Sequence, residues 1–178
     1  MSLFDALQQK MPQVATLLAD PRLRELLTRR ELRVTDDYLN REIMQQAGDD
    51  ELHGLSLRFL EGYGELSGTV RKRLLPAIPF SARFNVHGVE FGPMGKRLHL
   101  SLDEVRPIDL NWLTRRLVER VPFLAYRDGL MICDLLQMPT LGPWLDYRFK
   151  GKRLADFVTV KELVIREGEL VARLGICL

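Results

Sequence analysis

The chain has 178 residues, of which 46% are hydrophobic and 28% are charged. This composition is typical of a globular protein and excludes a disordered, collagen-like or coiled-coil chain. A single domain of this length buries roughly 70% of its unfolded surface, so a sizeable core is expected. The formal net charge is only +2, so attraction to nucleic acid or anionic lipid would have to come from a local patch.

No targeting or membrane-spanning segment is predicted. A signal peptide has a basic start, an apolar run and a cleavage site, and this pattern is not visible near the N-terminus. Instead, the acidic Asp5 lies in the first turn of the predicted N-terminal helix. The longest apolar runs fall short of the ~18 residues that a membrane span requires. Cys133 and Cys177 lie among apolar residues without metal-type spacing, which favours buried thiols in a reducing compartment. We expect a cytoplasmic protein or one peripheral to a membrane; removal of an export signal would make it periplasmic.

Two helices are predicted first. Residues 2–19 place leucine, methionine and valine side chains on one helical face, and Pro12 splits or kinks that helix. Asp20 is a good N-cap and Pro21 fits the first position of a second helix. This helix turns leucines inward and a row of arginines outward as far as Arg33. Without interleaved aromatic residues, the row is interpreted as a solvated helix face.

A third helix and a hairpin follow. Thr35 is expected to cap the helix, with Asp36 and Asp37 in its first turn, and the helix is expected to end at residues 48–50. From Leu52 the hydrophobic period changes to two, which predicts a hairpin with glycines at its bends.

A longer hairpin, over residues 79–107, organises the rest of the chain. Apolar and polar residues alternate on both sides of a turn at residues 92–95, as in strands with one dry and one wet face. The dry face must be covered by helices or by a bound molecule. Its principal members are Phe80, Ala82, Phe84, Val86, Leu98, Leu100 and Leu102.

The C-terminal third contains one more helix and more strands. Asp109 is expected to cap a helix over residues 109–121, and Pro122 ends it. Residues 123–136 are interpreted as a strand interrupted by a turn. In the closing hairpin the apolar positions change phase between Val160 and Leu163, which indicates a β-bulge.

These elements predict one α+β domain over residues 1–178. Residues 1–48 would form a helical part. Residues 52–178 would form mainly a long, curved antiparallel sheet of about six strands, packed on the N-terminal helices and on the inserted helix 109–121.

No motif points to catalysis. The sequence lacks G-x-S-x-G, H-E-x-x-H and P-loop patterns, so neither an enzyme nor a cofactor is predicted. His87 and His99 would lie roughly across from each other in the long hairpin, but two imidazoles without a third ligand do not make a zinc site. No metal is predicted.

One segment combines aromatic and basic residues. Such a mixture suits a membrane interface, single-stranded nucleic acid, or merely a strand with a basic turn. The membrane interface is favoured over nucleic acid. The residues expected to face it are Trp144, Tyr147, Phe149, Lys150, Lys152 and Arg153.

Two stretches resemble the bacterial tubular lipid-binding (TULIP-like) proteins. Residues 34–40, V-T-D-D-Y-L-N, are similar to a helix start of that group, and residues 158–170 are similar to its final hairpin with a glycine turn. The resemblance implies a curved sheet around an apolar groove and non-covalent lipid binding without catalytic residues. The helix over 109–121 and the lack of an export signal are departures from the group.

We therefore expect binding of a lipid or other apolar molecule, with peripheral membrane contact. The alternative is a protein-interaction or structural module whose helices fill the sheet completely. The sequence leaves the oligomeric state and the ligand open. The expected ligand-binding residues are Phe80, Phe84, Val86, Leu98, Leu100 and Leu102, with the loop from Met138 to Trp144 as a lid.

Overall fold

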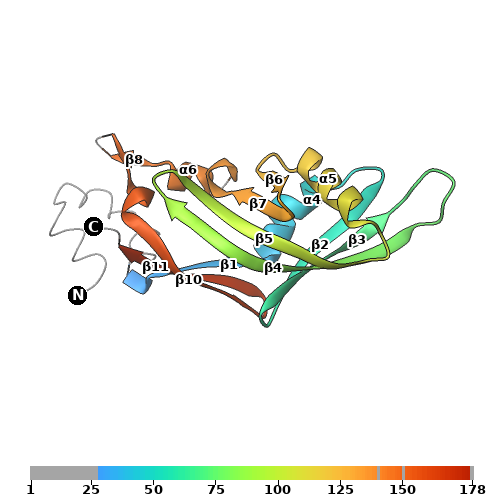
Figure 1. Ribbon diagram of the computed structural model, residues 1–178, viewed down its shortest axis with the longest axis horizontal. Coiled ribbons are helices and arrows are strands. Elements are labelled where there is room, and N and C mark those ends of the chain that lie inside the picture. The colour runs from blue at the N-terminus through green and yellow to red at the C-terminus, as the bar shows by residue number, and fades with distance from the viewer. Residues whose placement is uncertain (1–27, 140, 150, 177–178) are drawn as a thin grey trace.

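The computed structural model describes residues 28–139, 141–149 and 151–176. The helix predicted over residues 2–19 and most of the one beginning at Asp20 lie outside these residues. Over the described part the protein is α+β, as predicted, and it is elongated (Figure 1).

The described strands form two main antiparallel sheets rather than a single one. The larger sheet has six strands in the order β2-β3-β4-β5-β7-β6, and the smaller has the order β1-β11-β10. The predicted antiparallel sheet of about six strands is thus confirmed, but the closing hairpin, which was expected within it, belongs to the smaller sheet. The larger sheet comprises β2 (Leu52–Leu60), β3 (Tyr63–Val70), β4 (Ile78–Gly92), β5 (Gly95–Arg106), β6 (Leu124–Arg127) and β7 (Leu130–Asp134). The smaller comprises β1 (Glu31–Thr35), β10 (Val158–Arg166) and β11 (Glu169–Ile176).

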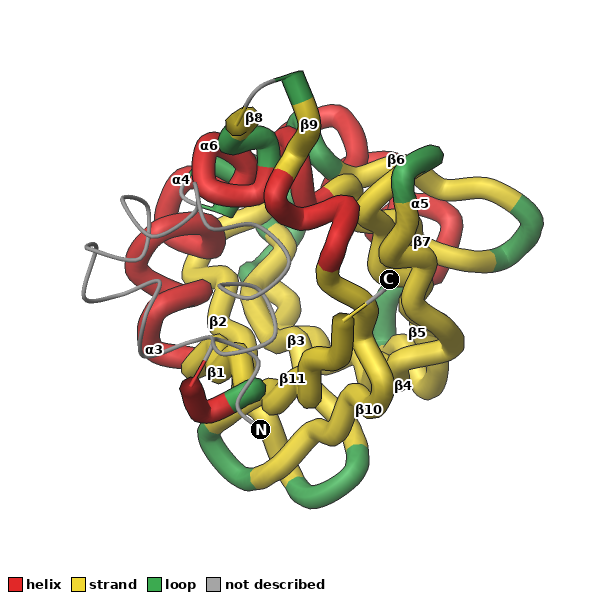
Figure 2. The backbone as a smooth tube through the Cα atoms, turned by 90° about the vertical axis from the view of Figure 1, so that its left-hand side faces the viewer, coloured by secondary structure: helices red, strands yellow, loops and turns green. Residues whose placement is uncertain are grey.

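Helical segments lie beside these sheets. Figure 1 shows α5 and α6 on one side of the long strands β4 and β5, and β1 with β10 on the other side. In the end-on view of Figure 2, strands and helices surround a common interior. One continuous segment comprises α3 (Asp36–Leu39), the π-helical turn η3 (Asn40–Met44) and α4 (Gln45–Ala47). The others are α5 (Leu110–Arg120), η4 (Leu135–Gln137), α6 (Gly142–Leu145) and η5 (Leu154–Phe157), besides the short strands β8 (Arg148–Phe149) and β9 (Lys152–Arg153).

The second predicted helix ends earlier than expected. Residues 28 and 29 are helical, but the chain turns at Arg30, whose φ is 55°, and then enters strand β1. Arg33 is consequently exposed on a strand, where its guanidinium lies 3.2 Å from the Glu169 carboxylate of β11. The strand forms because β11, 136 residues further along the chain, supplies its hydrogen-bonding partner, which a local helical pattern cannot reveal.

Two of the three predicted helix caps are confirmed, and the third, at Asp20, lies outside the described residues. The backbone N–H of Tyr38 donates to Thr35 Oγ1 at 3.2 Å, and that of Trp112 donates to Asp109 Oδ1 at 2.9 Å. Each side chain satisfies one of the free N–H groups of the first helical turn. The β-bulge in the closing hairpin is confirmed as well, because the register of β10 on β11 shifts between Val160 and Glu162.

The start of the third helix also protects the free edge of β2. Asn40 Nδ2 donates to the Leu57 carbonyl at 2.8 Å, and the Leu57 N–H donates to Asn40 Oδ1 at 2.6 Å. The Phe59 N–H donates to Asp36 Oδ2 at 3.1 Å, while the Phe59 carbonyl accepts from the Gly168 N–H at 2.9 Å. These groups replace a neighbouring strand and attach the turn of the closing hairpin to the larger sheet.

A buried lysine joins the two sheets near the β4–β5 turn. The Lys96 side chain is fully buried, with its ammonium 3.0 Å from Asp156 Oδ1 and 4.9 Å from the Phe91 ring centre. It also donates to the Gly92 carbonyl. Because Asp156 belongs to η5, directly before β10, the ion pair links β5 to the smaller sheet. A buried charge requires such pairing.

Candidate functional site

An apolar groove lies between the two sheets. Its volume is about 170 Å³, it is partly open to solvent, and every lining side chain is apolar. The larger sheet supplies Leu57, Phe59, Leu66, Phe84, Val86, Leu98, Leu100, Leu102, Leu124, Met131 and Cys133. The smaller sheet and the helical and connecting segments supply Val34, Leu39, Ile43, Met44, Leu117, Val121, Phe123, Leu135, Met138, Leu141, Ile165 and Leu170.

The floor of the groove consists of side chains that face each other across β4, β5 and β7. In the register of these strands, Val86 pairs with Leu100, and Leu100 pairs with Met131 on its other side. Leu98 pairs with Cys133 in the next row. Paired residues point to the same face of a sheet, so these rows form a continuous hydrocarbon surface.

An aromatic pair lines part of the groove. The Phe84 ring meets the Phe59 ring edge to face, with centroids 6.2 Å apart, and Phe84 is only 6% exposed. Gly64 makes room for this ring, because a Cβ atom at position 64 would lie 1.9 Å from Phe84 Cζ. The absent side chain of Gly64 therefore helps to set the position of the Phe84 ring in the groove wall.

Most of the predicted ligand-binding residues border the groove. Phe84, Val86, Leu98, Leu100, Leu102 and Met138 all line it. Phe80 does not; it is buried beyond the groove, where its ring packs over Gly68 beside Leu55. The Trp144 side chain lies outside the described residues.

The opposite wall was not predicted as part of a site. It includes Leu39, Ile43 and Met44, whose helical spacing marked a buried edge, and Leu117 and Val121 of α5. Their amphipathic pattern indicated burial, but no sequence signal distinguished residues that border a void from residues packed without one.

The groove contains one potential nucleophile, the thiol of Cys133, and that thiol is unreactive. Burial, followed by the neighbouring Asp134 carboxylate, raises the pKa of Cys133 to about 12. The thiolate is the reactive form of cysteine. At neutral pH Cys133 therefore contributes only an apolar surface to the groove.

No metal site accompanies the groove in the described part of the chain, where no group of three or more His, Cys, Asp or Glu side chains could hold an ion. His99 pairs with Gly88, next to His87 at a bulge in β4. The Nε2 atom of His99 lies 3.9 Å from a Glu90 carboxylate oxygen. The two histidines are thus neighbours across the hairpin without a third ligand.

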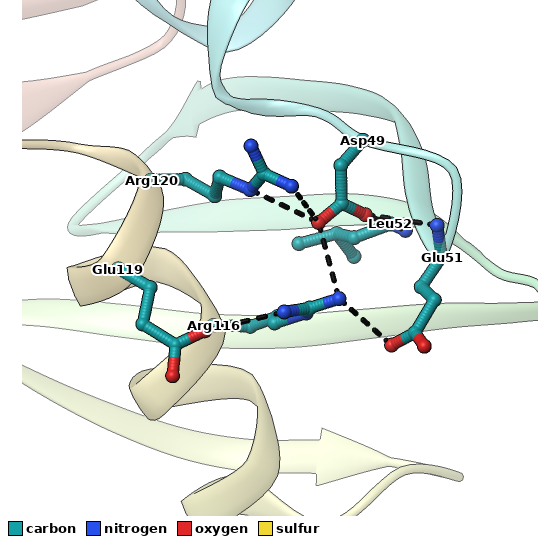
Figure 3. A network of polar contacts seen from close by, with 6 residues as sticks. All are labelled: Asp49, Glu51, Leu52, Arg116, Glu119 and Arg120. Atoms are coloured by element: carbon teal, nitrogen blue, oxygen red, sulfur yellow. Dashed lines mark hydrogen bonds and ion pairs between the residues drawn. The ribbon is translucent and has the colours of Figure 1, made fainter.

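A charged network fixes α5 beside the groove (Figure 3). The Asp49 carboxylate accepts from the Leu52 N–H at 2.7 Å and lies 2.8 Å from the Arg120 guanidinium and 3.2 Å from that of Arg116. Arg116 also reaches Glu51 at 2.9 Å. Burial opposes ionisation of Asp49, but these hydrogen bonds outweigh it and hold the pKa of its carboxyl below the usual value.

The predicted membrane-facing segment is only partly described. Tyr147 and Lys152 are exposed, whereas Arg153 forms an ion pair with Asp146 at 2.6 Å and Arg148 lies 3.7 Å from the same carboxylate. Lys150 and the side chains of Trp144 and Phe149 lie outside the described residues. Asp146 thus offsets part of the positive charge that the sequence placed here.

Within the described ranges, no helix combines the length and apolar character needed to cross a bilayer. No family model matches the chain, and no curated protein or solved structure is similar enough to assign it to a family.

Proposed function

We propose that the protein binds a lipid or other apolar molecule non-covalently in the apolar groove and performs no chemistry on it. The observation that carries this proposal is the groove itself, about 170 Å³ of space with an entirely apolar lining. Protein interiors are normally packed to the density of organic crystals. Unfilled apolar space next to solvent is therefore a feature that an apolar ligand can exploit.

The lining favours a ligand with a hydrocarbon part and no buried polar group. A polar headgroup inside the groove would lose its hydrogen bonds to water without replacement, which is costly. Such a headgroup would stay at the open side. Met44, Met131 and Met138 among the lining residues are flexible and let the groove adapt to different chains.

The volume limits what enters without rearrangement. Typical ligand pockets measure roughly 300–1,000 Å³, while an engineered apolar cavity of about 150 Å³ binds benzene. The groove therefore fits a small apolar molecule or a segment of one acyl chain, and the remainder of a longer lipid would extend through the open side. The TULIP-like resemblance of residues 34–40 and 158–170 supports the same proposal.

The small volume also supports a second candidate, a structural or protein-interaction module. In that case the groove would be a packing gap without a ligand. Phe80, Ala82 and Phe84 are buried in the core at and beside the groove, as such a module requires.

Filling the groove separates the two candidates. Leu100→Trp adds apolar volume where space exists, and Ile132→Trp is the matched control, because Ile132 is partly buried on β7 between the groove-lining Met131 and Cys133 and does not line the groove. Uptake of a fluorescent fatty acid would be measured by titration, and bound lipid by native mass spectrometry of protein purified without detergent.

We expect Leu100→Trp to weaken fatty-acid binding at least tenfold while its melting temperature stays near that of the wild type. Ile132→Trp should bind as the wild type does. Absence of uptake by the wild type, together with a mass free of lipid, would contradict the proposal and favour the structural module. Equal binding by both variants would place the ligand outside the groove.

A further inference from the structure

The loop between β3 and β4 presents apolar side chains to solvent. Residues 71–77 are exposed throughout, and the loop projects at the right-hand end of the molecule in Figure 1. Leu74 is 99% exposed and Leu75 is 54% exposed. Together they form an apolar tip at one end of the long axis.

The backbone holds this tip in a tight turn. The Leu75 N–H donates to the Lys72 carbonyl at 3.0 Å, and Leu74, the third residue of the turn, has a φ of 73°. Type II turns favour glycine at that position because other residues pay a steric cost there. A leucine at this position lowers local stability and exposes a large apolar side chain to water. This combination indicates that Leu74 serves a function other than stabilising the fold.

Three basic residues directly precede the two leucines in the sequence. Arg71, Lys72 and Arg73 are all exposed, and no carboxylate in the described part of the chain forms an ion pair with them. The Lys72 ammonium lies 5.4 Å from the Trp112 ring centre on α5. The loop thus differs from Arg116 and Arg120, whose charges are matched by Asp49.

We propose that this basic leucine loop, residues 71–75, docks the protein on an anionic lipid bilayer. Two leucines at the apex can enter the interface while cations behind them meet the headgroups. Trp112 beside Lys72 adds a side chain that favours the interfacial region.

The loop suits other partners less well. Single-stranded nucleic acid would require aromatic side chains for base stacking, and the loop itself has none. A stable protein partner buries about 1,000 Å² or more, which a single projecting turn does not supply. A bilayer needs only a small inserted tip and local positive charge.

Docking does not depend on occupancy of the groove, although α5 links the two regions. Trp112 contacts the loop, and Leu117 and Val121 of the same helix line the groove. A docked loop would therefore hold the groove close to the membrane surface.

Co-sedimentation with vesicles tests the proposal. The vesicles are phosphatidylcholine alone or phosphatidylcholine mixed with phosphatidylglycerol, and the proteins are the full chain and its variants. Arg71→Gln with Arg73→Gln removes two charges and leaves the Lys72–Trp112 contact, while Leu74→Ser with Leu75→Ser removes the apolar tip.

Two controls are matched to these changes. Met94→Ser replaces a side chain that is 90% exposed at the opposite end of β4. Tyr147→Ser with Lys152→Gln removes exposed aromatic and basic groups from the segment expected earlier to face a membrane.

We expect the wild type to bind the anionic vesicles and to prefer them strongly over neutral ones. Each lost cation should weaken binding about fivefold, so the arginine pair should cost about 25-fold, and the leucine pair at least tenfold. Both controls should bind as the wild type does. All loop variants should take up fatty acid normally, and Leu100→Trp should still dock, which separates this result from the groove proposal.

Failure of the wild type to bind anionic vesicles would overturn the proposal. So would unchanged binding by both loop variants, or loss of binding in the Tyr147 and Lys152 variant alone. A concentration-dependent dimer that Leu74→Ser abolishes, without vesicle binding, would show instead that the tip contacts a second copy of the chain.

Discussion

The two halves of the β4–β5 hairpin carry the same alternating pattern but are packed differently. Near the start of β4, Phe80, Ala82 and Phe84 are buried in the core. Toward the turn, Val86 and Leu100 are only partly buried and border the groove. A period of two predicts which face is apolar, whereas full packing depends on what the rest of the chain places against that face.

The largest effect is expected from a charge in the buried half of this hairpin, and a charge in the groove half provides the comparison. Phe84→Arg should prevent folding, with a loss of more than about 3 kcal/mol, because the guanidinium would be buried without a partner. Leu100→Arg should cost only about 1–2 kcal/mol, since its long side chain can reach the open side of the groove. Urea unfolding measures both changes.

The outcome bears on the groove as well. Leu100→Arg should remain folded and lose fatty-acid uptake, so it tests binding, whereas Phe84→Arg should not fold and therefore tests only packing, although Phe84 also lines the groove. A stably folded Phe84→Arg, or an unfolded Leu100→Arg, would show that the two halves of the hairpin are packed alike.

A smaller effect is expected at Gly64. An alanine there would force the Phe84 ring to move, because the added Cβ would lie 1.9 Å from Phe84 Cζ. Overpacking of this kind costs about 1–3 kcal/mol, and the displaced ring should reduce uptake by the groove. Gly88→Ala is the control, since nothing lies within 4 Å of its added Cβ. Equal free energies of unfolding for the two variants would contradict the prediction.

The smallest effect is expected from Asp49→Asn, which weakens the attachment of α5 beside the groove. Loss of the ion pairs with Arg116 and Arg120 should cost about 1 kcal/mol at neutral pH, because the arginines are partly exposed and the introduced asparagine can still accept from the Leu52 N–H. The exposed neighbour Asp50, changed to Asn, should cost almost nothing. Thermal unfolding of both variants tests this difference.

The stability of the wild type and that of Asp49→Asn should also depend differently on pH. The pKa of Asp49 is lowered in the folded protein, so its stabilisation is present above the ordinary aspartate pKa of about 3.9 and is lost as the pH falls through the lowered value. The wild type should therefore lose stability on acidification below about pH 4 more steeply than Asp49→Asn. Parallel curves would exclude a role for the Asp49 charge.

Part of the site could be predicted. The alternation in residues 79–107 identified Phe84, Val86, Leu98, Leu100 and Leu102 as one apolar face, and all five line the groove. Phe80 belongs to that face as well but lies beyond the groove. The R-K-R-L-L string of residues 71–75 was a signal that could have identified the basic leucine loop as a candidate surface, since it places three cations next to two leucines.

Short-range interactions along the chain specify the local features of the fold. The caps at Thr35 and Asp109 and the turn at residues 93–94 depend on residues only a few positions apart, and the bulge near Val160 lies within a hairpin of consecutive strands. Their hydrogen bonds close short loops, so local chemistry suffices to specify them.

The remaining features arise from contacts between distant parts of the chain. Strand β1 forms on β11, Lys96 finds Asp156, and the apolar face of β4 and β5 is covered incompletely by elements from both ends of the chain. Each of these depends on partners far apart in the sequence, whose meeting reflects the packing of the whole molecule. Hydrophobic periodicity specifies that a face avoids water, but the shape of the elements opposite it determines whether space remains for a ligand.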